Sequence, residues 1–299
     1  MRIHTIDLGF LGHSEAIAAF VVETAEGPVL IECGPYSTFP ALRAALQTLG
    51  YEPADIRRLF LTHIHFDHAG AAWALAEAGT PVLTHPAGAP HLAAPERLYN
   101  SARKIYGDDM DRLWGEMRPI VPERLHAPTH GEEIRIGDCV FTAWHTPGHA
   151  KHHIAWQVRG ADGADALFTG DVAGVRIHGG PPVPPCPPPD IDVEAWKDSI
   201  ALMRGLSASV YYLTHYGAVD APAAHLDALE RTLDALVEWV RPYAERDTPP
   251  EEILPLFRAF SKELLREQGV NEADMARYEA ANPSFMSVAG LLRYFKTRP

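Results

Sequence analysis

The sequence predicts an α/β layered fold followed by a helical C-terminal extension. Short apolar segments of strand character alternate with segments of helical periodicity over roughly the first 217 of the 299 residues. From about residue 220 onward, apolar residues recur at helical spacing. The third observation is the string His63-Ile64-His65-Phe66-Asp67-His68, which lies where a predicted strand gives way to a predicted helix.

The regular elements follow from turn residues and apolar periodicity. Leu42, Ala45, Leu46 and Leu49 have the i, i+3, i+4, i+7 spacing of a helix that ends at Gly50. Strands are expected where short aliphatic runs are bounded by turn residues, at 3–6, 17–22, 29–32, 56–61, 81–84, 134–136, 139–145, 154–158, 166–169 and 210–213. Helices are expected at 38–49, 68–78, 192–206 and, interrupted at Pro249-Pro250 and Asn282-Pro283, over 220–299.

Two segments do not fit this alternation. Residues 86–130 are punctuated by proline, with one or two helices expected between Tyr99 and Met117. Residues 178–189 contain seven prolines and are expected to form a stiff loop, because proline lacks an amide donor and disrupts helices. Both segments are predicted to border the active site, the first as an aromatic-containing lid. Its candidate ligand-contacting residues are Tyr99, Arg103, Lys104, Tyr106 and Trp114.

The histidine-rich string indicates a metal site. In an extended segment His63 and His65 point to the same side, because side chains alternate with period two. Asp67 and His68 follow at the start of the helix, where their side chains can turn toward the same region. Imidazole and carboxylate together suit zinc, iron or manganese.

This string resembles the metal-binding motif of the metallo-β-lactamase superfamily, and three later segments extend the resemblance. Thr146-Pro147-Gly148-His149, Thr169-Gly170-Asp171 and Leu213-Thr214-His215-Tyr216-Gly217 occur in the order that the superfamily pattern requires. The resemblance covers residues 1–217 and implies a four-layer αββα sandwich as the catalytic domain. Residues 218–299 would then be a helical extension packed on it, placed as in glyoxalase II enzymes.

The resemblance also implies a dinuclear centre, with two divalent metal ions. Zinc is expected, and manganese and iron fit the same donors. One metal would be held by His63, His65 and His149, and the other by Asp67, His68 and His215. Asp171 would bridge the two metals. Three protein ligands leave an open position, as in catalytic sites, and a shared hydroxide could attack a carbonyl without any side-chain nucleophile. Asp67 and Asp171 are the predicted catalytic residues.

The substrate is less closely defined than the metal site. The run Val172 to Ile177 matches neither the glycine-cysteine-glycine-arginine segment of glyoxalase II nor the related segment of persulfide dioxygenases. Gly174 stands where the quorum-quenching lactonases have a tyrosine, so Tyr36 or Tyr216 would have to replace it as oxyanion donor. We expect hydrolysis of a thioester or ester in a small molecule, ahead of a lactone and then a phosphodiester. A mononuclear-iron oxygenase and a non-catalytic metal-binding module are the alternatives.

Other polar residues near these motifs are expected to have supporting roles. Glu32 stands where the superfamily usually has an aspartate that steadies the metal site, and an ordinary strand end is the other interpretation. His152 and His153 are interpreted as structural or supporting residues, His145 as a packing residue and Cys186 as non-catalytic.

Composition and charge limit the partners. The net charge of −13 disfavours a nucleic-acid substrate, which would require a basic surface. The three cysteines have no paired spacing, and neither a signal peptide nor a membrane span is evident, so a cytoplasmic location is expected. The expected partner is a small-molecule substrate, without nucleic acid or membrane, and a homodimer is left open.

Overall fold

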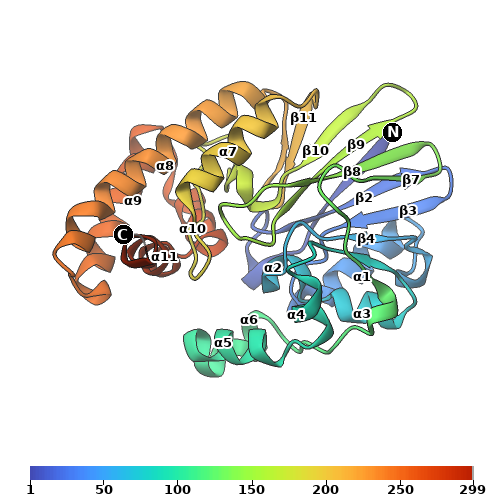
Figure 1. Ribbon diagram of the computed structural model, residues 1–299, viewed down its shortest axis with the longest axis horizontal. Coiled ribbons are helices and arrows are strands. Elements are labelled where there is room, and N and C mark those ends of the chain that lie inside the picture. Colours follow the sequence, from blue (N-terminus) through green and yellow to red (C-terminus); the bar gives the residue numbers. More distant parts are fainter. Residues whose placement is uncertain (298–299) are drawn as a thin grey trace.

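Two six-stranded sheets face each other, and helices cover both outer faces (Figure 1). The computed structural model describes residues 1–297. The first sheet contains, in spatial order, β1 (Arg2–Asp7), β2 (Ala18–Thr24), β3 (Gly27–Ile31), β4 (Leu59–Phe60), β5 (Val82–Leu83) and β6 (Leu125–His126). The second contains β12 (Gly217–Val219), β11 (Val210–Leu213), β10 (Asp165–Phe168), β9 (Ile154–Gly160), β8 (Cys139–His145) and β7 (Glu133–Ile136).

Both sheets are mixed, and their parallel strands lie where the metal motifs occur. In the first sheet β3, β4 and β5 run parallel, with Leu30 opposite Leu59 and Phe60 opposite Leu83. In the second sheet β10 and β11 run parallel. Chain segments that leave parallel neighbours emerge at the same edge of a sheet, so the loops after β10 and β11 emerge together, and the loop after β4 leaves the facing sheet.

The sheets enclose an aromatic core. Phe60 and Phe141 come from opposite sheets and stack with ring centroids 4.5 Å apart, and Trp156 meets Phe60 edge to face. All three are fully buried. This core holds the two sheets together.

Each outer face is covered by amphipathic helices. On the first sheet, α1 (Phe39–Thr48) and α3 (Ala72–Glu77) bury Leu42 and Leu75 against the strands. On the second sheet, α7 (Val193–Arg204) and α8 (Pro222–Glu245) bury Trp196 and Leu229. These four layers confirm the predicted αββα sandwich.

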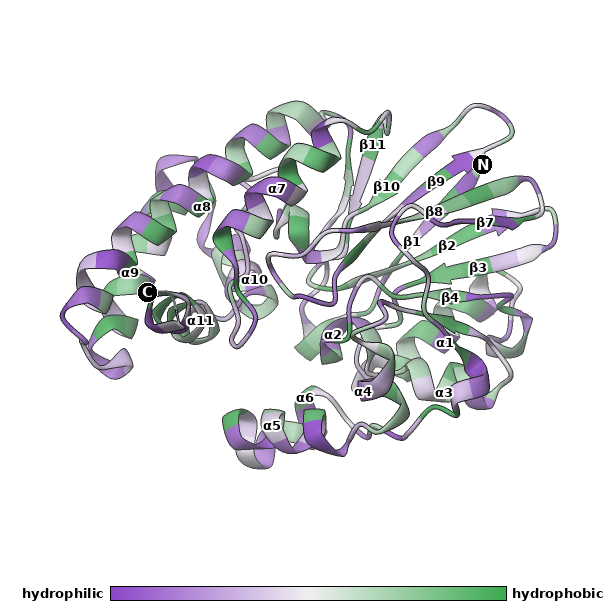
Figure 2. Ribbon diagram, viewed as in Figure 1, coloured by the Kyte–Doolittle hydropathy of each residue, from purple (hydrophilic) through white to green (hydrophobic). Residues whose placement is uncertain are grey.

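The C-terminal helices share one apolar core with the second sheet. They are α8 together with α9 (Pro250–Glu267), α10 (Glu272–Ala281) and α11 (Ser284–Thr297). Phe257 of α9 and Leu291 of α11 belong to the same buried cluster as Leu167 and Leu213 of the sheet. Figure 2 shows these helices with alternating hydrophobic and hydrophilic residues, as expected for helices buried on one side. The division into domains at residue 217 stays a prediction.

Some elements differ from the prediction because tertiary contacts override local pattern. The predicted helix over 68–78 is two helices, α2 (Phe66–Ala69) and α3, separated at Gly70. At Gly70 a Cβ atom would lie only 2.5 Å from the Phe66 carbonyl oxygen, so the chain passes too close for any other residue. The sequence did not indicate β6, β12 or α4 (Ala89–Ala93). The expectation of one or two helices between Tyr99 and Met117 agrees with α5 (Glu96–Tyr106), which begins three residues earlier, and α6 (Met110–Leu113).

None of the helices found in residues 1–297 is long and apolar enough to cross a membrane.

Candidate metal centre

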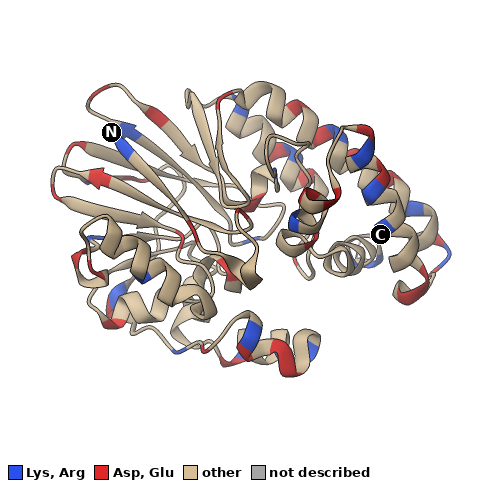
Figure 3. Ribbon diagram, turned by 180° about the vertical axis from the view of Figure 1, so that it is seen from behind, with Lys and Arg blue, Asp and Glu red and all other residues tan. Residues whose placement is uncertain are grey.

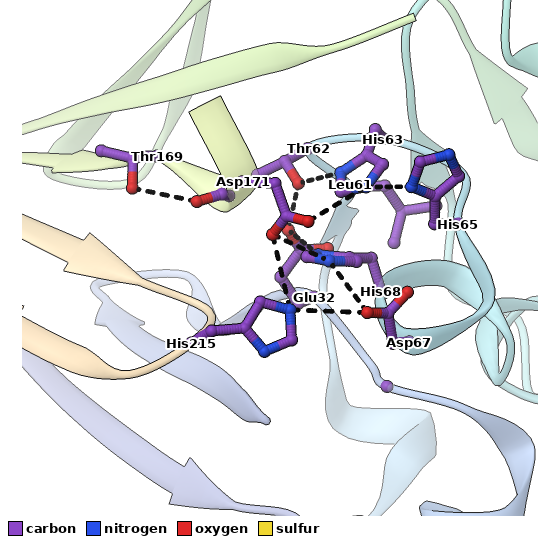
Figure 4. A network of polar contacts seen from close by, with 12 residues as sticks. Glu32, Leu61, Thr62, His63, His65, Asp67, His68, Thr169, Asp171 and His215 are labelled. Carbon is purple, nitrogen blue, oxygen red and sulfur yellow. Dashed lines mark hydrogen bonds and ion pairs between the residues drawn. The ribbon is translucent and has the colours of Figure 1, made fainter. Parts of the chain in front are cut away.

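The seven predicted ligands converge where segments leave both sheets, and Figure 4 shows six of them. Those that follow β4 enter the site from the first sheet, and the others enter from loops of the second sheet. They are His63 and His65 after β4, Asp67 and His68 in α2, His149 after β8, Asp171 in a short 3-10 turn after β10, and His215 after β11.

Three imidazole nitrogens form the first group. The Nδ1 atom of His65 lies 2.9 Å from Nε2 of His63 and 3.0 Å from Nε2 of His149. His63 and His149 are buried, whereas His65 lies at the edge of the group. Three nitrogens directed at one another in this way fit the donor set of a zinc-type site.

A carboxylate and two imidazoles form the second group. Oδ2 of Asp67 lies 3.6 Å from Nε2 of His68 and 3.4 Å from Nε2 of His215. Asp67 is the most exposed of the three side chains, at 20%. This group therefore has one face open to the outside of the protein.

Asp171 lies between the two groups and directs one oxygen at each. Its Oδ2 is 3.3 Å from Nε2 of His149 and 4.0 Å from Nε2 of His63. Its Oδ1 is 3.2 Å from Nε2 of His68 and 3.4 Å from Nε2 of His215. This is the placement that a bridging carboxylate requires.

Backbone carbonyls orient two of the histidines. Nδ1 of His149 donates to the Pro185 carbonyl (2.8 Å), and Nδ1 of His215 donates to the Ala16 carbonyl (2.6 Å). With the proton on Nδ1, the Nε2 lone pair faces the centre, which is the tautomer that a metal ligand needs.

Glu32 is hydrogen-bonded to His68 of the second group directly and to His63 of the first group through Thr62. Nδ1 of His68 donates to Oε1 of Glu32 (3.2 Å), and the Thr62 hydroxyl donates to the same oxygen. Nδ1 of His63 in turn donates to the Thr62 oxygen (3.0 Å). Glu32 is fully buried and has a left-handed backbone, with φ of +60°. Of the two sequence interpretations, the contacts therefore match the supporting role.

His153 supports the bridging carboxylate. The backbone N–H of Asp171 donates to Nε2 of His153 (3.2 Å), and Nδ1 of His153 donates to the Thr146 hydroxyl oxygen (2.8 Å). Its ring is therefore held in place by a strand-end residue on one side and by the metal-binding turn on the other. This matches the supporting role expected for it.

The first group is electrically neutral. Burial lowers the pKa of His63 far below its usual value, and it lowers the pKa of His65 to about 3. Burial also lowers the pKa of His149. These imidazoles therefore keep a free lone pair at neutral pH, as ligand binding requires.

The second group and Asp171 contain ionised carboxylates, which attract positive charge. Burial on its own would lower the pKa of His68, but the nearby carboxylates, that of Asp171 foremost, raise it well above its usual value. Burial opposes ionisation of Asp171 and Asp67, yet the adjacent histidines hold the pKa of Asp171 well below its usual range and that of Asp67 at about 2. Buried carboxylates are stable only when a cation or donors compensate them.

The donor set fits divalent metal ions. Within residues 1–297, the buried atoms Nε2 of His68, Nε2 of His215 and Oδ1 of Asp171 have no hydrogen-bond partner, although all three face the same point. Unpaired buried polar atoms are costly, and a shared cation would satisfy them together. The residues present thus fit the metals that the family implies.

A cavity of about 810 Å³ opens over the ligands. The segment 86–130 contributes Tyr106 and Trp114 to its wall, and the proline-rich segment contributes Pro187. The prediction that both segments border the metal pocket is confirmed. Pro283, between α10 and α11, and Phe285, at the start of α11, form a further wall that the sequence did not indicate.

Most of the remaining candidates lie away from this cavity. Tyr36 packs against Phe39, and Tyr216 belongs to apolar clusters, so neither lines the cavity as an oxyanion donor. Tyr99, Arg103 and Lys104 do not line it either, whereas His152 does. Nε2 of His145 donates to the Pro128 carbonyl (3.0 Å), which holds the ring in place. Cys186 is buried against α11, and burial raises its thiol pKa.

Comparisons with known proteins agree with this geometry. The family model for the metallo-beta-lactamase superfamily matches residues 15–215. The metallo-beta-lactamase fold-containing protein ST1585 of Sulfurisphaera tokodaii is 28% identical over 73% of this chain and 79% of its own length. The crystal structure of ST1585 superposes with a TM-score of 0.65 at 22% identity, covering 99% of this chain and 98% of that chain.

The names of two more relatives state the reaction that each catalyses. A hydroxyacylglutathione hydrolase of Methylobacterium sp. (strain 4-46) is 28% identical, over 54% of this chain and 51% of its own length. The atrochrysone carboxyl ACP thioesterase of Aspergillus fumigatus is 25% identical, over 74% of this chain and 44% of its own length. The family model, the fold and the converging histidines and aspartates together show that the chain belongs to the metallo-beta-lactamase superfamily and confirm the predicted metallo-β-lactamase-fold hydrolase.

Proposed function

We propose that the protein hydrolyses the thioester or ester bond of a small, largely apolar acyl compound at a dinuclear zinc centre. The observation that carries the proposal is the position of Asp171, with one oxygen directed at each of two ligand groups at the base of an apolar cavity. Two divalent metals bound there would polarise a carbonyl group and lower the pKa of a bound water.

The side chains around the centre have separate tasks in this reaction. Asp67 is the one carboxylate of its group and is partly exposed, and its low pKa keeps it ionised, so it can accept a hydrogen bond from the attacking water and orient it. Asp171, whose backbone is held by its contact with His153, fixes the position of the two ligand groups relative to each other. Tyr106 and Trp114 provide an apolar wall that would exclude bulk water from an acyl group.

A covalent mechanism finds no support among the cavity residues. Cys33, Cys139 and Cys186 are buried and line no part of the cavity, and burial raises the pKa of each thiol. Thiolates rather than thiols act as nucleophiles. Direct attack of water on the carbonyl carbon is therefore the expected route.

A thioester ranks ahead of an oxygen ester because two of the relatives are named a hydroxyacylglutathione hydrolase and a carboxyl ACP thioesterase. A nucleic-acid substrate is not supported by the surface. Figure 3 shows acidic and basic residues interspersed along the C-terminal helices, and the net charge is −13.

The discriminating assay compares thioesters, aryl esters, lactones and phosphodiesters with the zinc-loaded protein. We expect the highest kcat/KM for acyl thioesters, complete loss of activity on chelation, and no covalent acyl-enzyme in rapid-quench mass spectrometry. A phosphodiester turned over fastest, or a trapped acyl-enzyme, would refute the proposal. The Asp171→Asn variant is the matched control that identifies turnover from contaminating esterases.

A further inference from the structure

A second cavity of about 550 Å³ lies among the C-terminal helices, separate from the metal ligands. It lies between α8, α9 and α10 and has an apolar floor. Leu236, Phe257, Leu265 and Met275 form this floor, and each is buried in the protein. A cavity of this size and lining is typical of small-molecule sites.

The rim of this cavity carries an excess of positive charge. Its two acids are already paired, Glu279 with Arg258 (3.6 Å) and Glu272 with Arg266 (3.6 Å). Two further rim cations, Arg231 of α8 and Lys262 of α9, have no ion-pair partner within residues 1–297. An apolar floor under an uncompensated cationic rim is complementary to a molecule with a hydrocarbon chain and an anionic end.

The second cavity adjoins the cavity over the metal ligands. Glu279 and Asn282, at the end of α10, line both cavities. The second cavity nevertheless contains none of the predicted metal ligands. It therefore offers a site that the hydrolytic reaction does not use.

We propose that the second cavity binds a small amphiphile with a single carboxylate head group and a medium-length hydrocarbon chain. The carboxylate lies at the rim between Arg231 and Lys262, and the chain lies on the floor formed by residues such as Phe257 and Met275. This site is independent of the reaction proposed for the metal centre, since it would persist if the substrate assignment failed.

Isothermal titration calorimetry with dodecanoate, below its micelle concentration, tests the proposal on the full zinc-loaded chain. We expect one bound dodecanoate per chain, binding roughly fourfold weaker for each methylene removed from the ligand. Dodecanol, which has the same chain without the charge, should bind at least roughly tenfold weaker than dodecanoate. Equal affinities for dodecanoate and dodecanol would overturn the assignment of the rim.

Variants then locate the site. The double charge reversal Arg231→Glu with Lys262→Glu should weaken dodecanoate binding roughly tenfold or more. The matched control is Arg43→Glu with Arg135→Glu, an equal charge change at exposed positions outside both cavities. The control should stay within roughly twofold of wild type. Equal weakening in both double variants, or in neither, would overturn the proposal.

A variant that fills the second cavity tests the proposed site without changing its charge. Ala276 of α10 is exposed and lines the second cavity but not the first, so Ala276→Trp should fill the opening without disturbing the core. We expect loss of dodecanoate binding with an unchanged thermal midpoint and unchanged kcat/KM. Wild-type affinity in Ala276→Trp would place the ligand elsewhere and refute the assignment.

Discussion

Shortening Glu32 to aspartate should weaken metal binding more than removing its charge. The superfamily usually has an aspartate here, so Glu32→Asp restores the common residue. In this chain, however, Oε1 of Glu32 accepts from both the Thr62 hydroxyl and Nδ1 of His68 (3.2 Å). Losing one methylene withdraws the carboxylate by about 1.5 Å, which takes it out of hydrogen-bonding distance of both donors.

The expected magnitudes follow from burial. Glu32→Gln keeps an acceptor in place but exchanges a charged hydrogen bond, worth about 1.5–3 kcal/mol, for a neutral one, worth about 0.5–1.5 kcal/mol. We therefore expect metal affinity to fall about fivefold to tenfold. Glu32→Asp leaves two buried donors unpaired at about 1–3 kcal/mol each, so affinity should fall about 30-fold or more.

The assay is a zinc titration of the apo-protein against a fluorescent chelator. The larger loss should occur in the group that contains His68, with a smaller loss transmitted through Thr62 to His63. Glu23→Asp is the matched control, because Glu23 contacts the His4 ring (2.8 Å) on the first two strands, outside the metal site. Zinc affinity in Glu32→Asp within about threefold of wild type, or greater than in Glu32→Gln, would refute the reasoning.

Three further predictions concern the bridge, the cavity and pH. Asp171→Asn should bind one zinc per chain instead of two by elemental analysis, and kcat/KM should fall by more than the about 100-fold typical of supporting residues; two retained metals would contradict the bridge. The Tyr106 hydroxyl has no hydrogen-bond partner within residues 1–297 and lines the metal cavity. Tyr106→Phe should therefore lower kcat/KM about twofold to tenfold at unchanged thermal stability, whereas Tyr99→Phe, which alters a hydroxyl outside the cavity, should have no effect; equal effects would exclude a contact with substrate. Burial lowers the pKa of His178, but its contacts with Glu15 and with Asp274 (2.7 Å) outweigh burial and raise it. The stabilisation is then present below the ordinary histidine pKa and lost as pH rises through the raised value, so the thermal midpoint of wild type should exceed that of His178→Ala at pH 6 and match it at pH 9. A difference that grows with pH would have the wrong sign.

The convergence of the predicted ligands could be anticipated because they are adjacent in sequence or directly follow strands. His63, His65, Asp67 and His68 lie within six residues, and a strand-to-helix junction is sufficient to bring them together. The role of Glu32 depended on a contact with His68, which is 36 residues away. No local pattern reports such a pairing.

The cavity wall was only partly predictable, for a related reason. The proline content of residues 178–189 and 86–130 indicated irregular loops, and loops after ligand-bearing strands gather at active sites. Phe285 reaches the same cavity because α11 packs on the core of the second sheet. That packing depends on amphipathic faces, which specify burial but do not specify the partner surface.

The hydrogen bond from His149 to the Pro185 carbonyl has a practical consequence for engineering substrate range. Pro185 and residues 187–189 are natural targets for saturation libraries, since they border the cavity. Yet the carbonyl of Pro185 fixes the tautomer of His149, a predicted metal ligand, so we expect a library member that moves this carbonyl to change metal retention together with selectivity. Screens of such libraries at limiting metal would discard variants whose altered selectivity is hidden by metal loss, and screening with the metal in excess would separate the two effects.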